Sequence, residues 1–256
     1  MVPSRSDSQI ATADLETGSL SIPNGLDSLP CYFARPKNTA GPRPCVIVVH
    51  EIFGVHEYIR DVCRRLAHEG YYAITVDLFA RYGDATGMTD FKQIYADIVL
   101  KTSMEQIFRD LDACVAYLEQ DRHADSHCLG MTGFCWGGNI TWMYASRAPR
   151  LKAGVAWYGR LKGDLTPSQQ QFPLDVVQDL AVPVLGLYGA EDASIPLYLV
   201  DQMRELLNKG KSGSDIKVFP HVGHAFHAYY RPTYDEHAAK EGWADMLNWF
   251  RKHGLG

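Results

Sequence analysis

The stretch Gly133-Phe-Cys135-Trp-Gly137-Gly constrains this chain more than any other. It follows the apolar residues 129–134 and precedes a segment with helical spacing, which predicts a sharp turn from a strand into a helix. In such a nucleophile elbow the central residue is strained, and its flanking positions must be nearly free of side chain so that strand and helix can approach. Gly133 and Gly137 meet this requirement. A thiol at Cys135 would point out from the end of a sheet, at a helix N-terminus whose dipole favours the thiolate.

Short apolar runs recur along the chain between longer segments with helical spacing. The runs are residues 45–50, 73–79, 129–134, 153–158, 184–188 and 216–219. Continuous runs of this length are typical of strands that are buried on both faces. The helical segments are residues 58–68, 103–118, 140–146, 199–207 and 238–250, and the second of them opens with the capping-box pair Ser103 and Gln106. The alternation predicts an α/β fold with a mostly parallel central sheet and helices on both faces.

The N-terminal part of the chain has a different pattern. Residues 1–17 are polar and predict a flexible arm. Residues 19–23 and 29–34 then predict two strands around the turn signal Asn24-Gly25. The chain has 256 residues, which is compatible with one large core, and we expect a single α/β domain over residues 18–256.

Composition excludes several classes of function. With 46% hydrophobic and 21% charged residues and a net charge of −5, the chain has no basic footprint for nucleic acid. The apolar runs are too short to cross a bilayer, and the start lacks the pattern of a signal peptide, so we expect a cytoplasmic protein. The six cysteines show no C-x-x-C, which indicates neither a disulfide framework nor a structural zinc site. Oligomeric state is open between a monomer and a small homo-oligomer.

A thiol nucleophile needs a base, and the base needs an orienting acid. In the α/β-hydrolase arrangement acid and base follow the nucleophile in chain order, each after a later strand. The run 184–188 leads into Glu191-Asp192, and the run 216–219 leads into His224. We predict Asp192 as the acid and His224 as the base, with Glu191 as the competing acid. A helix-capping role for Asp192 and a loop histidine without chemistry are the alternatives.

Three histidines, His221, His224 and His227, stand three apart and raise the possibility of a metal site. Pro220 and Gly223 argue for a loop, and the glutamate of an H-E-x-x-H motif is missing, so we predict no metal and no cofactor.

The loop after residues 45–50 should provide the second donor of an oxyanion hole. We expect the backbone N–H groups of Ile52 and Trp136 to form that pair. Glu51 beside them is unusual, because a carboxylate near a thiol either binds its proton or raises its pKa. A solvated loop acid is the alternative for Glu51.

Together these motifs resemble the dienelactone hydrolase family over residues 29–250. The combination is specific, whereas Gly-x-Cys-x-Gly alone would be weak. The motifs are His50-Glu-Ile-Phe-Gly54, Asp77-Leu-Phe-Ala-Arg81, Gly133-Phe-Cys-Trp-Gly-Gly138, Gly189-Ala-Glu-Asp192 and Gly223-His-Ala-Phe226.

The resemblance implies a Cys–His–Asp triad at Cys135, His224 and Asp192 that opens the enol-lactone ring of dienelactone to maleylacetate without a cofactor. It also implies that Glu51 holds the resting thiol away from the histidine until substrate enters, and that Arg81 anchors a substrate carboxylate.

One position departs from the family. Four residues after the catalytic histidine, its well-characterised members carry a second anchoring arginine, and this chain has Ala228. Arg231 lies close in sequence and is the candidate substitute. Tyr158 follows a strand end and could line the pocket, or it could belong to the core.

The sequence therefore predicts a hydrolase that cleaves a lactone or activated carboxylic ester through an acyl-enzyme intermediate. Transfer of the acyl group to a small thiol or amine is an alternative enzymatic reading. A redox-sensing or binding protein with a reactive Cys135 is the non-enzymatic one. Which ester or lactone is the substrate stays open.

Overall fold

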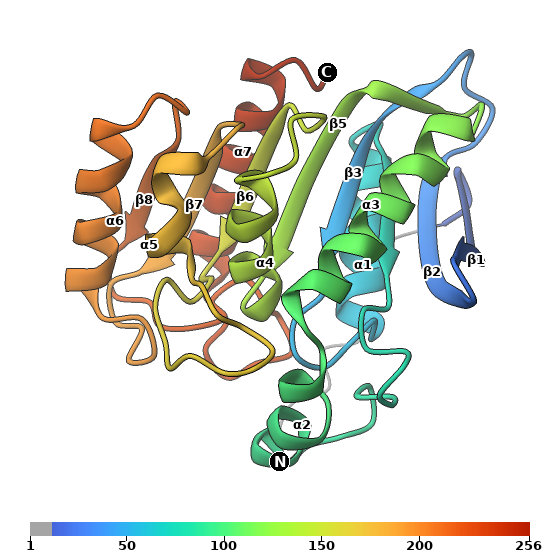
Figure 1. Cartoon of the computed structure of the whole chain (residues 1–256). Coiled ribbons are helices and arrows are strands. Elements are labelled where there is room, and N and C mark those ends of the chain that lie inside the picture. Colours follow the sequence, from blue (N-terminus) through green and yellow to red (C-terminus); the bar gives the residue numbers. More distant parts are fainter. Residues whose placement is uncertain (1–11) are drawn as a thin grey trace.

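A single eight-stranded sheet forms the centre of the computed structural model, which describes residues 12–256 (Figure 1). The strand order is β1-β2-β4-β3-β5-β6-β7-β8. All six predicted apolar runs form strands, and these six are mutually parallel. The strands are β1 (Leu15–Asn24), β2 (Asp27–Pro36), β3 (Arg43–Val49), β4 (Tyr72–Val76), β5 (Ala124–Phe134), β6 (Ala153–Trp157), β7 (Val184–Gly189) and β8 (Asp215–Phe219). The predicted mostly parallel sheet is confirmed.

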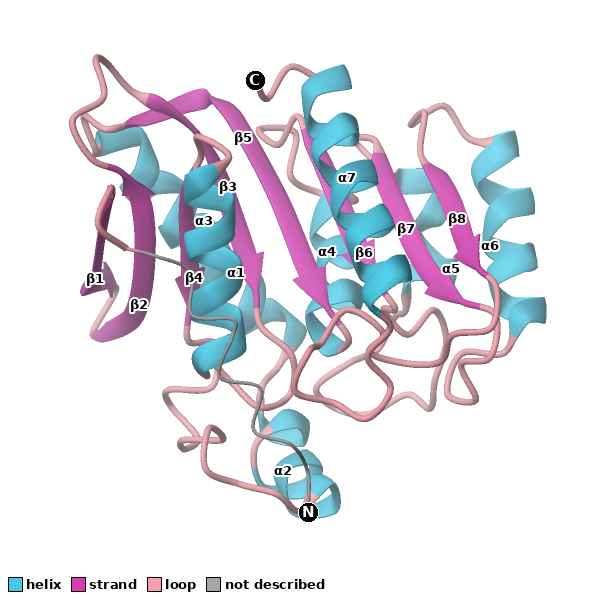
Figure 2. Ribbon diagram, turned by 180° about the vertical axis from the view of Figure 1, so that it is seen from behind, coloured by secondary structure: helices cyan, strands magenta, loops and turns pink. Residues whose placement is uncertain are grey.

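Helices cover both faces of the sheet, as the alternating pattern predicts. Helices α1 and α7 pack on one face, and α3, α4 and α6 on the other (Figures 1 and 2). The helices are α1 (Glu57–His68), α2 (Phe91–Asp97), α3 (Met104–Gln120), α4 (Trp136–Ala145), α5 (Pro173–Val176), α6 (Leu197–Lys209) and α7 (Glu236–Lys252), with short 3₁₀ turns η1 (Val99–Lys101) and η2 (Val177–Asp179). This two-sided cover buries β6, β3 from Cys45 onward and β5 from Leu129 onward, and these parts of the strands are almost wholly apolar.

The predicted N-terminal hairpin is present, but it begins earlier than expected. Strands β1 and β2 pair antiparallel, and Gly25 supplies the positive φ of 64° in their tight turn. The boundary of the arm at residue 17 is wrong, because Leu15 already pairs with Pro36 and is buried in the core. Residues 1–11 of the expected arm lie outside the described part of the chain.

The capping box predicted at Ser103 forms only in part. The Ser103 hydroxyl accepts a hydrogen bond from the Gln106 N–H at 3.2 Å and caps α3 as expected. The Gln106 side chain turns away from the cap and donates to Asp110 Oδ1 at 2.8 Å. The Gln106 Oε1, which the box would have used as an acceptor, accepts instead from Arg109 Nη2 at 2.9 Å.

Strand order reverses direction next to β3. From β3 the chain moves to β4 on one side, and it then returns through α3 to β5 on the other side. In open α/β sheets, ligands bind outside the carboxyl ends of the strands at such a switch point. The loops after β3 and β5 therefore mark the expected place of the site, at the lower edge of the sheet in Figure 1.

A small cap lies beyond this edge and carries α2 and η1 (Figures 1 and 2). Its apolar side chains form a second core, separate from the main one, with Ile94 and Ile98 at its centre. The same cluster contains Ile52 from the loop after β3 and packs against Trp136 at the start of α4. The cap thus rests on two loops of the switch point.

Candidate active site

The turn from β5 into α4 has the geometry expected of an elbow. Cys135 has φ 54° and ψ −112° and caps the N-terminus of α4. A Cβ at Gly133 would lie 2.1 Å from the Gly137 carbonyl oxygen, and a Cβ at Gly137 would lie 2.3 Å from the Val49 oxygen. Only glycine fits at either position, because real Cβ atoms do not come so close to other atoms. The strained cysteine is held at the switch point by this close packing.

The loops after β7 and β8 bring His224 and Asp192 into contact. The distance between His224 Nδ1 and Asp192 Oδ2 is 2.7 Å. The other carboxylate oxygen accepts from the N–H and hydroxyl of Ser194 at 2.8 and 2.6 Å. Burial opposes ionisation of Asp192, but the hydrogen bonds from His224 and Ser194 outweigh it and lower the pKa of this carboxyl. The competing acid, Glu191, lies 3.4 Å from the exposed His221 instead.

The pKa of His224 depends on its contacts with Cys135 and Asp192. Burial alone would lower the pKa of His224, but the negative charge of Cys135 and hydrogen bonds with Asp192 and Cys135 raise it to about 10. An imidazole with a raised pKa stays protonated at neutral pH. The arrangement can therefore place a proton donor next to the Cys135 sulfur.

The expected oxyanion donors lie on neighbouring loops. Val49 of β3 pairs with Gly133 of β5, so the segments that follow these strands run side by side. Trp136 is the first residue of α4, where backbone N–H groups have no acceptor within the helix. Ile52 sits in a turn closed by a hydrogen bond from Gly54 N–H to the Glu51 oxygen at 3.1 Å.

Glu51 is buried and held by two side chains that sequence reasoning missed. His56 Nε2 lies 2.9 Å from Glu51 Oε1, and the Tyr230 hydroxyl donates a hydrogen bond to the same oxygen. Glu51 is only 2% exposed, so the alternative of a solvated loop acid is wrong. No sequence signal could have found Tyr230, which is 179 positions from its partner.

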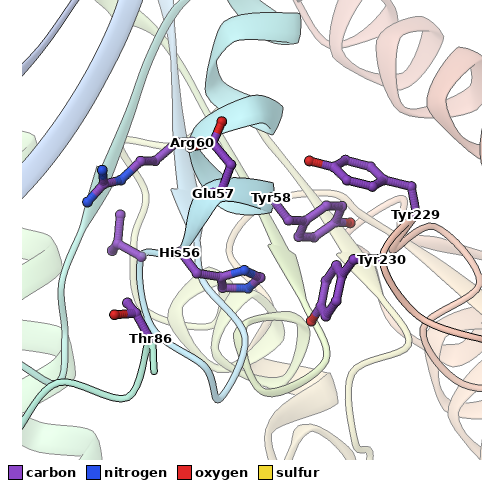
Figure 3. A pocket seen from close by; sticks show the side chains of 8 residues that line it. His56, Glu57, Tyr58, Arg60, Thr86, Tyr229 and Tyr230 are labelled. Atoms are coloured by element: carbon purple, nitrogen blue, oxygen red, sulfur yellow. The ribbon is translucent and has the colours of Figure 1, made fainter. Parts of the chain in front are cut away.

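A pocket of about 520 Å³ lies beside Glu51 (Figure 3). His56 and Tyr230 form part of its wall and face one another, with ring centroids 5.2 Å apart. Arg60 and Thr86 also line this pocket, whereas Cys135 and His224 do not. The lining of the pocket therefore includes both side chains that contact Glu51 but not the thiol.

Tyr158 lies against His224, the predicted base, and is also part of the core. Its ring is fully buried and meets the His224 ring edge-on, with centroids 5.1 Å apart. Its backbone has a positive φ of 39°, which is uncommon for a bulky residue and fixes the ring at the end of β6. Tyr158 therefore belongs to the core, as one of the two interpretations from the sequence has it, and it is absent from the lining of the pocket beside Glu51.

Arg81 does not match its expected role as a substrate anchor. Its Nη1 and Nη2 contact the two oxygens of Asp110 at 2.7 and 3.0 Å, and its Nε contacts Asp27 at 2.7 Å. Asp110 is fully buried on α3 and also accepts from Asn24 at 2.6 Å. The guanidinium is thus engaged on all three nitrogens in an ion pair that ties α3 to the β1–β2 hairpin.

Arg231, by contrast, packs on the loop after β3 and on Tyr230. Its guanidinium carbon is 5.5 Å from the Phe53 ring centroid and 6.0 Å from that of Tyr230. Phe53 follows Ile52 in the loop after β3, so these contacts bring a cation close to the expected oxyanion donors. Ala228 is buried and presents no polar group there.

The three histidines of the possible metal site point to different surroundings. His221 is exposed, His224 binds Asp192, and His227 is buried with its Nδ1 2.6 Å from the Tyr58 hydroxyl. Within residues 12–256 no three histidine, cysteine or acidic side chains gather in a way that could hold a metal ion. All six cysteines are free thiols. In the same part of the chain, the helices are too short or too polar to cross a membrane.

Comparison with known proteins assigns the family. The dienelactone hydrolase family model matches residues 29–254. A curated relative from Salmonella typhimurium, named "Putative carboxymethylenebutenolidase", is 48% identical over 240 residues, which are 94% of this chain and 88% of the relative. A crystal structure of a "Putative Dienelactone Hydrolase" from Klebsiella pneumoniae has a TM-score of 0.90 at 48% identity and covers 93% of this chain and 99% of its own.

A more distant structure shares only the fold. An acylaminoacyl peptidase from Pyrococcus horikoshii superposes with a TM-score of 0.74 at 17% identity, over 94% of this chain and 42% of the peptidase. The predicted α/β-hydrolase fold is confirmed by these similarities together with the sheet order. The relatives also identify the chain as a lactone or ester hydrolase. The elbow, the strand order and the match over residues 29–254 agree, and the chain belongs to the dienelactone hydrolase family.

Proposed function

We propose that this hydrolase cleaves its ester or lactone through a triad of Cys135, His224 and Asp192 and an acyl-enzyme intermediate. The observation that carries the proposal is the 2.7 Å contact between His224 and Asp192, together with the effect of Cys135 on the pKa of His224, which is raised to about 10 although burial opposes the rise. A buried, hydrogen-bonded acid orients the imidazole and stabilises its charged form. A thiolate kept beside an imidazolium is a ready nucleophile.

In the acylation half, the Cys135 thiolate forms a bond to the carbonyl carbon. The carbonyl oxygen becomes an oxyanion, which accepts hydrogen bonds from the N–H groups of Ile52 and Trp136. When the oxyanion collapses, the bond between the carbonyl carbon and the leaving oxygen breaks. His224 gives its proton to that oxygen. In a lactone the leaving oxygen stays attached to the acyl group, so the opened ring remains on the enzyme as a thioester.

In the deacylation half, neutral His224 removes a proton from a water molecule that attacks the thioester. The second oxyanion uses the same two N–H groups. Its collapse breaks the carbon–sulfur bond and releases the carboxylic acid. The thiolate and the imidazolium are then restored, so no net proton stays on the enzyme.

Arg231 is the cation that would bind the carboxylate of a carboxylated substrate. The guanidinium lies over the ring of Phe53, next to Ile52 in the same loop, and no ion pair within residues 12–256 engages it. A planar guanidinium suits bidentate recognition of a carboxylate. We therefore infer that the substrate is a lactone or ester with a carboxylate close to the scissile bond.

The test uses a chromogenic aryl ester and a carboxylated enol lactone with wild type, Cys135→Ala and Cys128→Ala. Cys128 is the matched control, since it is the other partly exposed cysteine and lies far along β5 from the elbow. Cys135→Ala should lose on the order of 10⁴-fold or more in kcat, and rapid quenching of wild type should give acyl mass on the Cys135 peptide. Turnover that survives in Cys135→Ala would refute the triad.

Substrate class is tested separately with Arg231→Gln. We expect KM for the carboxylated lactone to rise about tenfold or more, because a charge-assisted pair is lost. KM for the uncharged aryl ester should change little. Equal effects on both substrates would contradict carboxylate recognition by Arg231 and leave the triad intact.

A further inference from the structure

His50 is a buried histidine at the end of β3 that the proposed mechanism does not use. It directly follows Val49, the last residue of the strand, and it is fully buried. Both of its ring nitrogens have backbone partners. Nε2 lies 3.1 Å from the nitrogen of Leu78, in the segment after β4, and Nδ1 lies 2.7 Å from the Glu51 carbonyl oxygen. The ring therefore joins the segments that follow two neighbouring strands.

These two contacts determine which ring nitrogen carries the proton. A backbone N–H can only donate, so the contact with Leu78 requires that Nε2 of His50 accepts and carries no hydrogen. Burial lowers the pKa of His50, which keeps the ring neutral at neutral pH. A neutral imidazole has a single N–H group, which is then on Nδ1. His50 therefore donates a hydrogen bond to the Glu51 carbonyl oxygen.

The Glu51 carbonyl belongs to the same peptide group as the N–H of Ile52. Its oxygen accepts a second hydrogen bond, from the Gly54 N–H at 3.1 Å, so both of its lone pairs are used. A trans peptide is planar, and its C=O and N–H point in opposite directions. The two donors on the oxygen therefore determine the direction of the Ile52 N–H, and they also polarise the peptide so that this N–H becomes a stronger donor.

The Ile52 N–H is available to a ligand. None of the hydrogen bonds within residues 12–256 uses it as a donor, although Ile52 is only 4% exposed. The backbone N–H of a buried residue nearly always has a partner, so a free one is unusual. A free donor with a fixed direction is what the stabilisation of an oxyanion requires.

His50 also contacts the segment that carries the other proposed donor. Its ring stacks on the Trp136 side chain, with centroids 5.4 Å apart and an interplanar angle of 21°. The Phe79 ring packs against both rings, with a centroid distance of 4.7 Å to each. The His50 carbonyl lies against the first turn of α4, where a Cβ at Gly137 would be 2.6 Å from its oxygen. One residue therefore sets the spacing between the loop after β3 and the start of α4.

We propose that His50 is a positioning residue that aims the Ile52 N–H, through the Glu51 carbonyl, at the oxyanion of the reaction. This inference rests on the proposed function, in which Ile52 and Trp136 provide the two donors. His50 itself transfers no proton and does not touch the substrate. It holds the peptide in the orientation that the transition state needs, so that no reorganisation of the donor is required during the reaction.

The kinetic test compares His50→Phe and His50→Asn with wild type on para-nitrophenyl acetate. Phenylalanine keeps a ring on Trp136 but has no nitrogen, whereas the amide nitrogen of asparagine can replace Nδ1 as the donor to Glu51. Both half-reactions form an oxyanion, so kcat of His50→Phe should fall about tenfold to a hundredfold, while KM stays within about threefold. His50→Asn should keep kcat within about threefold of wild type.

His253→Phe is the matched control. This histidine also lies against a tryptophan ring, that of Trp249, with centroids 4.6 Å apart. It caps the C-terminus of α7, at the opposite edge of the sheet from the cap (Figure 1). Its kcat and KM should be those of wild type. All variants are assayed below their melting transitions, which thermal melts establish first.

Alkylation of Cys135 by iodoacetamide separates an effect on the oxyanion from an effect on the thiol. The reaction forms no oxyanion, so its rate should be the same in wild type, His50→Phe and His50→Asn. A slower alkylation that matches the loss of kcat would overturn the proposal, because His50 would then act on the sulfur.

Nitrogen NMR of wild-type protein with isotopically labelled histidine tests the tautomer, and it decides the proposal even where His50→Phe does not fold. The His50 signals are assigned by their loss in His50→Asn. They should show a protonated Nδ1 and an unprotonated Nε2 at neutral pH. A proton on Nε2 would overturn the proposal, since Nδ1 could then not donate to Glu51.

The kinetic outcomes distinguish this proposal from that of the triad. Normal kcat in His50→Phe, equal losses in His50→Phe and His50→Asn, or a rise in KM at constant kcat would each reject the role of His50. The triad is refuted by a different result, which is turnover that survives in Cys135→Ala. Turnover that depends on Cys135 together with an unaffected His50→Phe would reject His50 alone.

Discussion

The ion pair of Arg81 with Asp110 allows a direct test of whether Arg81 serves the fold or the substrate. The substitution Arg81→Met keeps the length and apolar stem of the side chain and removes only the charged fork. Asp110 is left fully buried, with Asn24 at 2.6 Å and Gln106 at 2.8 Å as its remaining donors.

The expected loss of folding free energy depends on how deeply Arg81 and Asp110 are each buried. Removing one partner of a buried ion pair costs about 3–5 kcal/mol. Two neutral donors still solvate Asp110, and the Arg81 side chain is 18% exposed, which reduces the loss to about 2–4 kcal/mol. For a chain of this size that corresponds to a fall in Tm of roughly 5–15 °C. The bond to Asp27, whose side chain is 54% exposed, adds less than about 1 kcal/mol.

Urea unfolding and thermal melts of wild type, Arg81→Met and Asp27→Asn measure these differences. Asp27→Asn is the matched control, since it removes only the exposed partner of the same guanidinium. At 20 °C the folded fraction of Arg81→Met should keep kcat and KM within about threefold of wild type. An unchanged Tm with a tenfold higher KM for a carboxylated lactone would refute the structural role and restore Arg81 as a substrate anchor.

Three further substitutions probe the elbow, the acid and the cap. Gly133→Ala would place a Cβ 2.1 Å from the Gly137 oxygen and should abolish soluble folded protein, whereas Gly87→Ala, with open space around its Cβ, should express and melt like wild type. The pKa of Asp192 is lowered in the folded protein from its ordinary value of 3.8, so ionised Asp192 stabilises the fold above that pH. This stabilisation is lost as the pH falls through the lower pKa of the folded state. The difference in Tm between wild type and Asp192→Asn should therefore shrink below pH 4. Ile98→Ala in the cap should lower kcat several-fold in steady-state assays, and a change in KM alone would contradict this reasoning.

The strands and the elbow could be predicted because their signals are local. Apolar runs between helical segments identify the parallel strands whatever their partners are. Gly133 and Gly137 mark a close approach that only a turn of this kind requires. The choice of Asp192 over Glu191 also followed from local order, and the structure brings Asp192 to His224.

The remaining features depend on partners far apart in the sequence. Arg81 stands in a motif that suggests substrate binding, but in the structure it forms an ion pair with Asp110, which lies 29 residues later on α3. Glu51 gave a sequence signal, whereas its partner Tyr230 gave none. In both cases the pairing follows from which loops the sheet order places together, and a single sequence does not contain that information.

The cap has a consequence for anyone who wishes to change what this enzyme accepts. Its apolar centre rests on Ile52 and Trp136, whose main-chain N–H groups are the proposed donors to the oxyanion. Substitutions at Ile94 or Ile98 that reshape the cap therefore also alter the support of those donors. We therefore expect substitutions in the cap to change substrate selectivity and turnover rate together.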